Sequence, residues 1–174
     1  LKCNRNTISS VLIEPMQSTF GDNYLSDFFL QEVSYLCHEY DIPLIFDEIQ
    51  TGFGTTGKVW YHEHLNIIPD IIVFGKKSQV SGIMVDDKYN AIFSDPWRLW
   101  ITFDGDVLDM IRSKYIIRTI KERGLMNNIK MMSVFFRGEL KKLTSLRNVR
   151  GLGGLIAFDF HSTIARDMFY KTCF

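Results

Sequence analysis

Three short apolar runs lie in the first half of the chain, at Val11–Ile13, Pro43–Phe46 and Ile71–Phe74. Each is apolar at consecutive positions, which is typical of strands buried on both faces of a parallel sheet. A helical pattern separates the first two runs, with Ser26 in front of it as the candidate N-cap. The apolar positions of this helix recur at steps of four, three and four residues: Phe29, Val33, Leu36 and Tyr40.

Helical patterns dominate the second half. Residues 77–105 are rich in loop-forming residues, and we expect one or two short strands among them. A helix is predicted over Val107–Glu122, ended by Gly124 as its C-terminal cap, and a second helix over Leu125–Leu143. The segment Arg150–Phe160 is predicted to form a strand, and the last residues begin another helix.

The alternation of apolar runs and helical patterns predicts an α/β fold with a mostly parallel sheet and flanking helices. The alternation stops near residue 120. We therefore predict one domain over residues 1–120 and the beginning of an α+β domain over 121–174. The chain does not start with methionine and ends within a predicted helix, so we expect a fragment of a longer protein.

Composition indicates a globular protein, with 46% hydrophobic and 23% charged residues. Twenty basic residues balance twenty acidic ones, so the net charge gives no indication of nucleic acid or anionic membranes as partners. No apolar run approaches the ~20 residues of a membrane helix, and no secretory signal opens the sequence. Cys3, Cys37 and Cys173 are widely spaced and are interpreted as free thiols, which favours a cytoplasmic enzyme.

Two predicted strands end in residues that can carry chemistry. Asp47 and Glu48 follow one strand, and Lys76 follows the next. The separation, 76 − 47 = 29 residues, allows one crossover to a neighbouring parallel strand, so we expect the carboxylate and the amine on the same edge of the sheet. We expect Lys76 to meet little water, which favours its free amine. A free amine attacks carbonyls and an aspartate can keep a pyridine nitrogen protonated, so the pair suits pyridoxal-phosphate chemistry.

Structural interpretations of the same residues stay open. Asp47 could cap a turn, and Lys76 could be a solvated loop lysine. Gly52–Lys58 spells the G-x-x-x-x-G-K of a nucleotide-binding loop, but Val59 replaces the Ser or Thr that binds magnesium. His62–His64 has the wrong spacing for a zinc protease helix, so no metal site is predicted. The Cys37–His38 pair is interpreted as part of the amphipathic helix.

The stretch Leu44–Gly82 resembles the class III aminotransferases, which are pyridoxal-phosphate-dependent enzymes of fold type I. It contains a DE-x-Q-T-G-x-G-x-x-G segment and a P-D-I-x-x-x-G-K segment in the family's order and spacing. The phrase FGKKSQVSG is most similar to the lysine 6-aminotransferase branch. The resemblance implies part of the fold type I large domain (PLP-transferase) and the start of the C-terminal small domain.

Site roles follow from this resemblance. Lys76 would form the Schiff base with pyridoxal 5′-phosphate and move protons between substrate and cofactor carbons. Asp47 would bind the pyridine nitrogen, Gln50 would lie near the phenolic oxygen, and Lys77 would be a branch-specific neighbour. Thr102 would reach the phosphate of a partner subunit's cofactor, which implies a homodimer.

The sequence departs from the family in two places. Residues 103–106 (FDGD) follow Thr102 where the family has an aromatic residue, two glycines and an asparagine. The two added carboxylates would repel a phosphate by about 1 kcal/mol each. Residues 18–20 (STF) stand where the lysine branch has a glycine-rich stretch with an acidic residue that helps select the substrate.

The expected activity is transfer of the terminal amino group of L-lysine to 2-oxoglutarate, with small-molecule amino-acid and 2-oxo-acid substrates. One alternative is another class III enzyme, acting on ornithine, acetylornithine or 4-aminobutyrate. The other is a catalytically inactive fragment that serves as a structural or interaction module. The phosphate-binding turn, the ring-stacking aromatic residue and the carboxylate-binding arginine of the family lie outside these residues.

Overall fold

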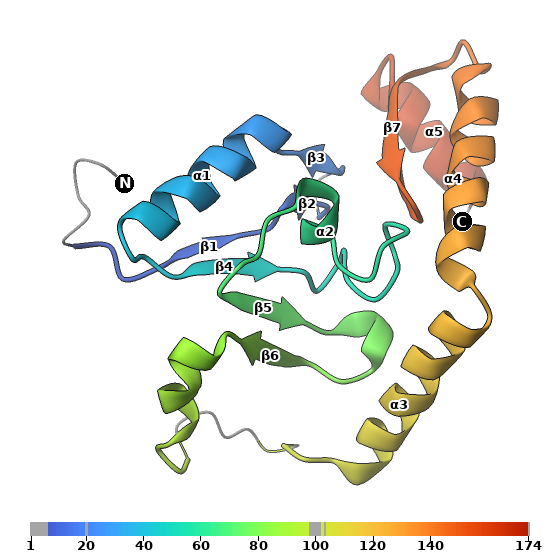
Figure 1. The fold of residues 1–174 in the computed structure, drawn as a ribbon. Helices are drawn as coiled ribbons and strands as arrows, with labels where there is room; N and C mark the ends of the chain where they lie inside the picture. The colour runs from blue at the N-terminus through green and yellow to red at the C-terminus, as the bar shows by residue number, and fades with distance from the viewer. Residues whose placement is uncertain (1–6, 20, 98–101, 103, 174) are drawn as a thin grey trace.

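A four-stranded sheet forms the centre of the computed structural model, which describes residues 7–19, 21–97, 102 and 104–173 (Figure 1). Its strand order is β1-β4-β5-β6, with β1, β4 and β5 parallel and β6 antiparallel. The predicted α/β fold with a mostly parallel sheet is confirmed. In chain order the elements are β1 (Val11–Ile13), β2 (Met16–Gln17), β3 (Asn23–Tyr24), α1 (Asp27–Glu39), β4 (Leu44–Asp47), α2 (His62–Leu65), β5 (Ile71–Phe74), the 3-10 helix η2 (Lys76–Ser78), β6 (Gly82–Val85), the 3-10 helix η3 (Asp87–Phe93), α3 (Val107–Glu122), α4 (Leu125–Lys141), β7 (Leu146–Leu152), β8 (Leu155–Phe160) and α5 (Thr163–Cys173).

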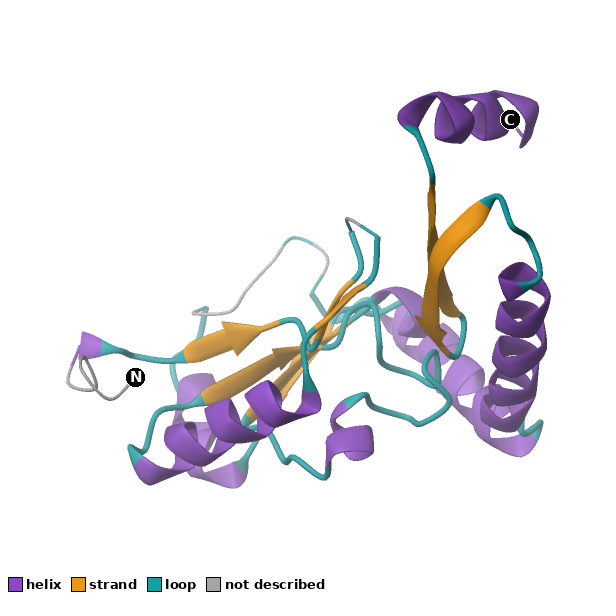
Figure 2. Ribbon diagram, turned by 90° about the horizontal axis from the view of Figure 1, so that it is seen from above, coloured by secondary structure: helices purple, strands orange, loops and turns teal. Residues whose placement is uncertain are grey.

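Helix α1 covers one face of this sheet. Figure 2 shows α1 and α2 on the same side of the strands. Leu44 and Phe46 of β4 point into this layer and are buried together with Leu30 and Cys37 of α1. Burying such side chains contributes roughly 1.5–3 kcal/mol each. The predicted N-cap is confirmed, because Oγ of Ser26 accepts the backbone N–H of Phe29 at 3.2 Å.

The opposite face of the sheet is covered by neither α1 nor α2 (Figure 2). Leu12 of β1, which pairs with Ile45 of β4, has 64% of its surface exposed. Asp47 alternates with the buried Phe46 along β4 and so lies on this second face. The candidate carboxylate therefore does not belong to the layer that α1 fills.

The prediction of a single strand over Arg150–Phe160 is wrong, because β7 and β8 form an antiparallel hairpin there. Gly153 and Gly154 turn the chain between them, and Gly153 has a φ of +61°. A Cβ at Gly153 would lie 2.1 Å from the carbonyl oxygen of Thr55, and the amide of Gly154 donates to that oxygen at 2.8 Å. The paired glycines form a tight turn that divides the predicted strand into two.

Helices α3 and α4 connect the sheet to this hairpin (Figure 1). Gly124, with a φ of +62°, lies directly between them and ends α3 as predicted. The domain boundary placed near residue 120 stays a prediction. Among the residues that the structure describes, no helix is long and apolar enough to cross a membrane. Cys37 and Cys173 are free thiols, and Cys3 lies outside the described residues.

Candidate active site

The ends of β4 and β5 lie next to each other at one edge of the sheet. The two strands are parallel, and their register pairs Asp47 with Val73. Lys76 follows Val73 by three residues and begins the 3-10 helix η2. The carboxylate and the amine therefore come from neighbouring strand ends on the carboxyl edge, as the spacing predicts.

Asp47 has one oxygen engaged and one available. Its Oδ1 accepts the backbone N–H of Ile49 at 3.0 Å, which holds the turn after β4. Within the described part of the chain, its Oδ2 accepts no hydrogen bond, and the residue is half-buried. Such a carboxylate can bind a protonated ring nitrogen without giving up its structural contact.

Glu48 has an entirely different environment from Asp47. It is fully buried and accepts three hydrogen bonds, from Oγ1 of Thr51 (2.9 Å) and from the backbone N–H groups of Tyr61 (2.6 Å) and His62 (3.0 Å). Burial raises the pKa of the Glu48 carboxyl above its ordinary value, and the hydrogen bonds oppose that shift. Glu48 therefore closes the long loop between β4 and α2, and its carboxylate makes no hydrogen bond to Asp47, Gln50 or Lys76.

Lys76 is exposed, so the expectation that it meets little water is wrong. Its backbone explains the difference. With a φ of +53° it turns the chain away from β5 into η2, and that conformation costs about 1 kcal/mol or more for a residue other than glycine. Among the described residues, its Nζ makes no hydrogen bond or ion pair. The side chain is thus accessible to a ligand, on a backbone that the surrounding structure holds in an unfavourable conformation.

Lys77 is the lysine that lies in the drier environment. It is half-buried, and its Nζ donates to the carbonyl oxygens of Ile49 (3.4 Å) and Gln50. Burial lowers the pKa of Lys77, and the neighbouring charge of Lys76 lowers it further. The sequence contained only the Lys-Lys doublet as a signal, which does not tell which lysine is buried.

Gln50 and Thr102 complete the predicted cofactor residues. Gln50 is half-buried in the turn after β4, three residues beyond Asp47. Thr102 lies in an exposed turn, and residues 101 and 103 on either side of it are outside the described ranges. The role of Thr102 at a partner's cofactor stays a prediction.

Two large cavities lie beside the candidate site. One, of about 950 Å³, begins at Glu14 after β1 and lies between the β2–β3 and β7–β8 hairpins. The other, of about 1020 Å³, is an apolar groove between Phe74 and Met84 of the sheet and helix α3. Neither is lined by Asp47 or Lys76.

The competing motifs have structural roles. Nζ of Lys58 donates to the carbonyl oxygen of Glu63 at 2.7 Å, and the residues directly before Gly52 form a turn after the end of β4. The nucleotide-loop interpretation is therefore not supported. Nδ1 of His62 bonds with the carbonyl of Ile67, and Nε2 of His64 with Oγ1 of Thr56. The described ranges contain no cluster of three or more side chains that could hold a metal ion.

Comparison with known proteins decides the family. The model of the family described as "Aminotransferase class-III" matches residues 1–173. The chain belongs to the class III aminotransferases. L-lysine-epsilon aminotransferase of Mycobacterium tuberculosis is 36% identical over 169 residues, which are 92% of this chain and 38% of that protein. The 4-aminobutyrate aminotransferase of Schizosaccharomyces pombe is 35% identical over 171 residues, or 93% of this chain and 36% of that protein.

Solved aminotransferase structures share the architecture of this chain. Lysine aminotransferase from Mycobacterium tuberculosis superposes with a TM-score of 0.82 at 35% identity, covering 90% of this chain and 38% of that one. Ornithine delta-aminotransferase of Plasmodium falciparum superposes with a TM-score of 0.79 at 28% identity, covering 87% and 42%. The fold type I prediction is confirmed. The chain spans less than half the length of these relatives.

Class III aminotransferases depend on pyridoxal 5′-phosphate, and the residues of this chain fit that cofactor. A carboxylate oxygen of Asp47 and the amine of Lys76 have no partner within the described chain and lie on neighbouring strand ends. These are the acceptor and the nucleophile that a pyridine ring with an aldehyde requires. Gly75 lies between β5 and Lys76 and is buried. A Cβ at this position would lie 2.8 Å from Oγ of Ser81, so a larger residue would force Ser81 to move.

Proposed function

We propose that this chain is the part of a pyridoxal-phosphate-dependent class III aminotransferase that supplies the reactive lysine, Lys76, and its partner carboxylate, Asp47. The observation that supports this most directly is the parallel pairing of β4 with β5, which brings the two strand ends to one edge of the sheet. The unpartnered amine and the half-free carboxylate add chemical support.

Each residue has a task that its surroundings allow. Asp47 would hold a proton at the ring nitrogen through Oδ2 while Oδ1 keeps the turn in place. Gln50, in the same turn, would lie near the phenolic oxygen. The exposed amine of Lys76 would bind the cofactor and then accept and return the proton of the substrate carbon as general base and acid. The bound cofactor supplies the electron sink for this chemistry.

Borohydride reduction of the protein with added pyridoxal phosphate tests the proposal. Peptide mass spectrometry is expected to find the cofactor attached to the peptide that contains Lys76, well above labelling at exposed Lys114. Lys76→Ala should abolish this product, and Asp47→Asn should weaken cofactor retention. Labelling of Lys76 no greater than that of Lys114 would support the inactive-module alternative.

For the substrate, we propose transfer of the terminal amino group of L-lysine to 2-oxoglutarate. The similarity to L-lysine-epsilon aminotransferases supports this assignment. A second candidate is supported by nearly equal identity to 4-aminobutyrate aminotransferases. The sequence STF at residues 18–20, without an acidic residue, also separates the chain from the lysine branch.

Mixing cofactor-loaded protein with single amino donors separates the two candidates. L-lysine is expected to change the cofactor absorbance faster than 4-aminobutyrate or L-ornithine at equal concentration. A faster change with 4-aminobutyrate would transfer the assignment to that branch. Because the relatives are longer than this chain, the gene's full product is the better material for this measurement.

A further inference from the structure

The contact between Lys77 and the turn after β4 joins the two strand ends of the candidate site. Nζ of Lys77 donates to the carbonyl oxygens of Ile49 and Gln50, which lie 28 and 27 residues earlier in the chain. These two residues follow Asp47 within the same turn. One side chain therefore connects the turn that carries the carboxylate with the turn that carries Lys76.

Packing at the same place agrees with this connection. A Cβ built on Gly75 would lie 3.8 Å from Cγ1 of Ile49, so the two turns are close to van der Waals contact. Lys77 is half-buried, and a partly desolvated ammonium requires hydrogen-bond acceptors. The two carbonyl groups supply them. Its lowered pKa reflects the same desolvation.

We propose that Lys77 is a positioning residue, which holds the Asp47–Gln50 turn against the Gly75–Ser78 turn and so sets the separation between the carboxylate and the reactive lysine. The consequence for catalysis rests on the proposed function. The Lys77 contact itself involves only residues of this chain, so it can be measured without cofactor. Two amides report on it, because Ile49 N–H donates to Oδ1 of Asp47 and Gly52 N–H donates to the carbonyl of Glu48.

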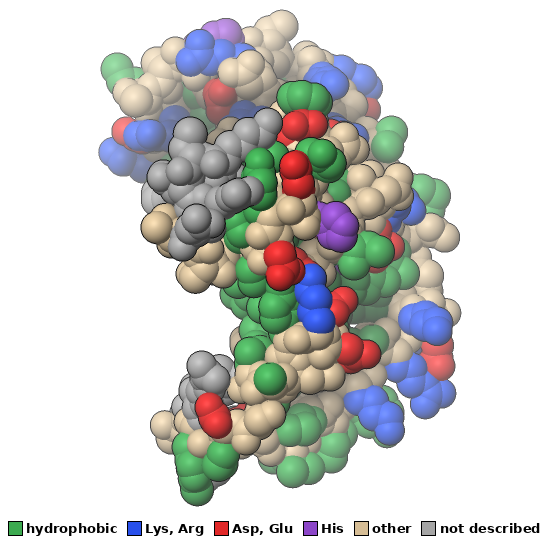
Figure 3. Space-filling model, turned by 60° about the vertical axis from the view of Figure 1, so that its left-hand side comes forward, with side chains coloured by type: hydrophobic (Ala, Val, Ile, Leu, Met, Phe, Trp, Pro, Cys, Tyr) green, Lys and Arg blue, Asp and Glu red, His purple; other side chains and the backbone are tan. Residues whose placement is uncertain are grey.

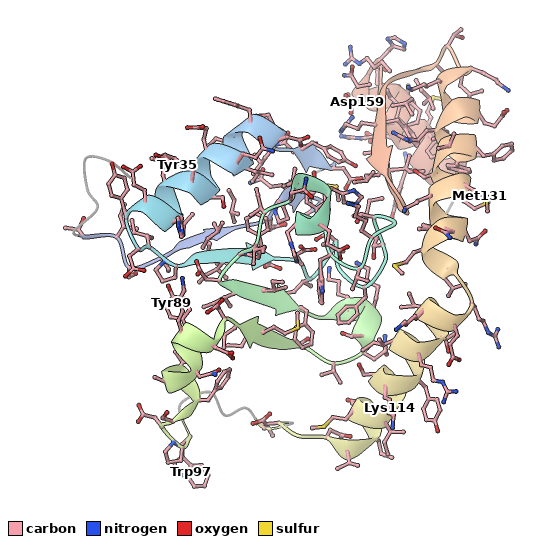
Figure 4. The ribbon with its side chains drawn as sticks, in the orientation of Figure 1. Tyr35, Tyr89, Trp97, Lys114, Met131 and Asp159 are labelled. Carbon is pink, nitrogen blue, oxygen red and sulfur yellow. The ribbon has the colours of Figure 1, made fainter. Side chains whose placement is uncertain are left out.

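Hydrogen exchange of the cofactor-free protein tests the contact. Lys77→Met removes the donors and keeps an unbranched side chain that is one atom shorter. The Ile49 and Gly52 amides are expected to exchange about tenfold faster in this variant, because losing hydrogen bonds from a charged donor makes local opening easier. Lys114→Met, on the exposed surface of α3, is the matched control and should leave both amides unchanged (Figure 4). Equal exchange in Lys77→Met and the parent overturns the proposal.

Cofactor capture tests the positioning role. The pyridoxal phosphate concentration that gives half-maximal fixation at Lys76 is expected to rise about tenfold in Lys77→Met and to stay constant in Lys114→Met. Lys77→Arg keeps a charged donor and should recover most of the loss. Faster exchange with unchanged capture overturns the positioning role. If the parent itself captures no cofactor, the proposed function fails, and the exchange measurement alone decides whether the contact exists.

Discussion

At the scale of single residues, the adjacent acids Asp47 and Glu48 differ in burial and therefore in what their carboxylates can bind. Asp47 keeps an oxygen free at the sheet edge, whereas Glu48 uses both oxygens on three donors in the interior. Because the donors to Glu48 include the backbone of Tyr61 and His62, this carboxylate closes the loop of residues 49–61. This loop contains Gln50, so Glu48 stabilises the segment that carries one of the candidate site residues.

Replacing Glu48 with alanine is expected to destabilise the protein by about 3 kcal/mol, because the buried N–H of Tyr61, the partly buried N–H of His62 and the Thr51 hydroxyl lose their acceptor. Urea unfolding measures the change. Glu32→Ala, at an exposed position of α1, is the control and should shift stability by less than about 0.5 kcal/mol. Equal midpoints for the two variants would show that the buried network contributes nothing.

Glu48 also predicts a pH dependence of stability. Its native pKa is raised above the ordinary value of 4.5, so the native state binds more protons than the unfolded state between the two values. The contribution of this group to the free energy of unfolding is therefore fully present below pH 4.5, and it is lost as the pH rises through the native pKa. Glu48→Gln should remove that decline. The urea midpoints of parent and variant are compared across pH 4.5–7. The same pH dependence in both proteins would contradict the prediction.

Much of the site could be predicted at this scale, since the positions of Asp47 and Lys76 follow from strand ends and spacing. The exposure of Lys76 could not, because it depends on a positive φ that no local pattern signals for a lysine. The contact of Lys77 with Gln50 spans 27 residues and requires the packed turns themselves. The family resemblance assigns the reactive role to Lys76 and assigns no role in the site to Lys77.

At the scale of elements, two glycines with the same backbone conformation have different surroundings. Gly153 in the β7–β8 turn has a φ of +61°, and Gly124 between α3 and α4 has a φ of +62°. A Cβ at Gly153 would collide with the backbone of Thr55, whereas nothing lies within 4 Å of one at Gly124. The hairpin thus rests directly on the loop after β4. The sequence alone does not separate its two strands, because glycines also occur at strand ends.

This pair gives a matched experiment. Gly124→Ala should cost about 1 kcal/mol, the price of a left-handed conformation without a clash. Gly153→Ala should cost at least about 2 kcal/mol more, because the hairpin must move away from Thr55. Thermal and urea unfolding compare the variants. Equal losses would mean that the hairpin does not press on the loop.

At the scale of the whole molecule, much apolar surface remains uncovered. Figure 3 shows hydrophobic side chains among acidic and basic ones on one face. Leu108 of α3, Val134 of α4 and Ile164 of α5 are 72%, 67% and 72% exposed, and Met131 projects from α4 (Figure 4). Exposed apolar side chains that gather into a patch mark contact sites in proteins. The homodimer implied by the family resemblance is our proposal for part of this surface.

The purified chain is expected to bind an apolar fluorescent dye and to associate as its concentration rises. Leu108→Lys combined with Val134→Lys should reduce both effects, because the charges interrupt the apolar surface. Light scattering and dye fluorescence measure the two properties. Monomeric behaviour of the parent at all concentrations, without dye binding, would contradict the prediction.

The hairpin that presses on Thr55 also reaches further back. Arg150 of β7 donates to the carbonyl oxygen of Gly21, 129 residues earlier, and to that of Asp22. During synthesis on the ribosome, all four central strands have been made once residue 85 has emerged, but this guanidinium arrives only after a further 65 residues. Contacts between such distant positions form late. The β2–β3 hairpin therefore lacks this contact in the nascent chain until Arg150 has been made, and the cavity beside β2 and β3 stays open until then.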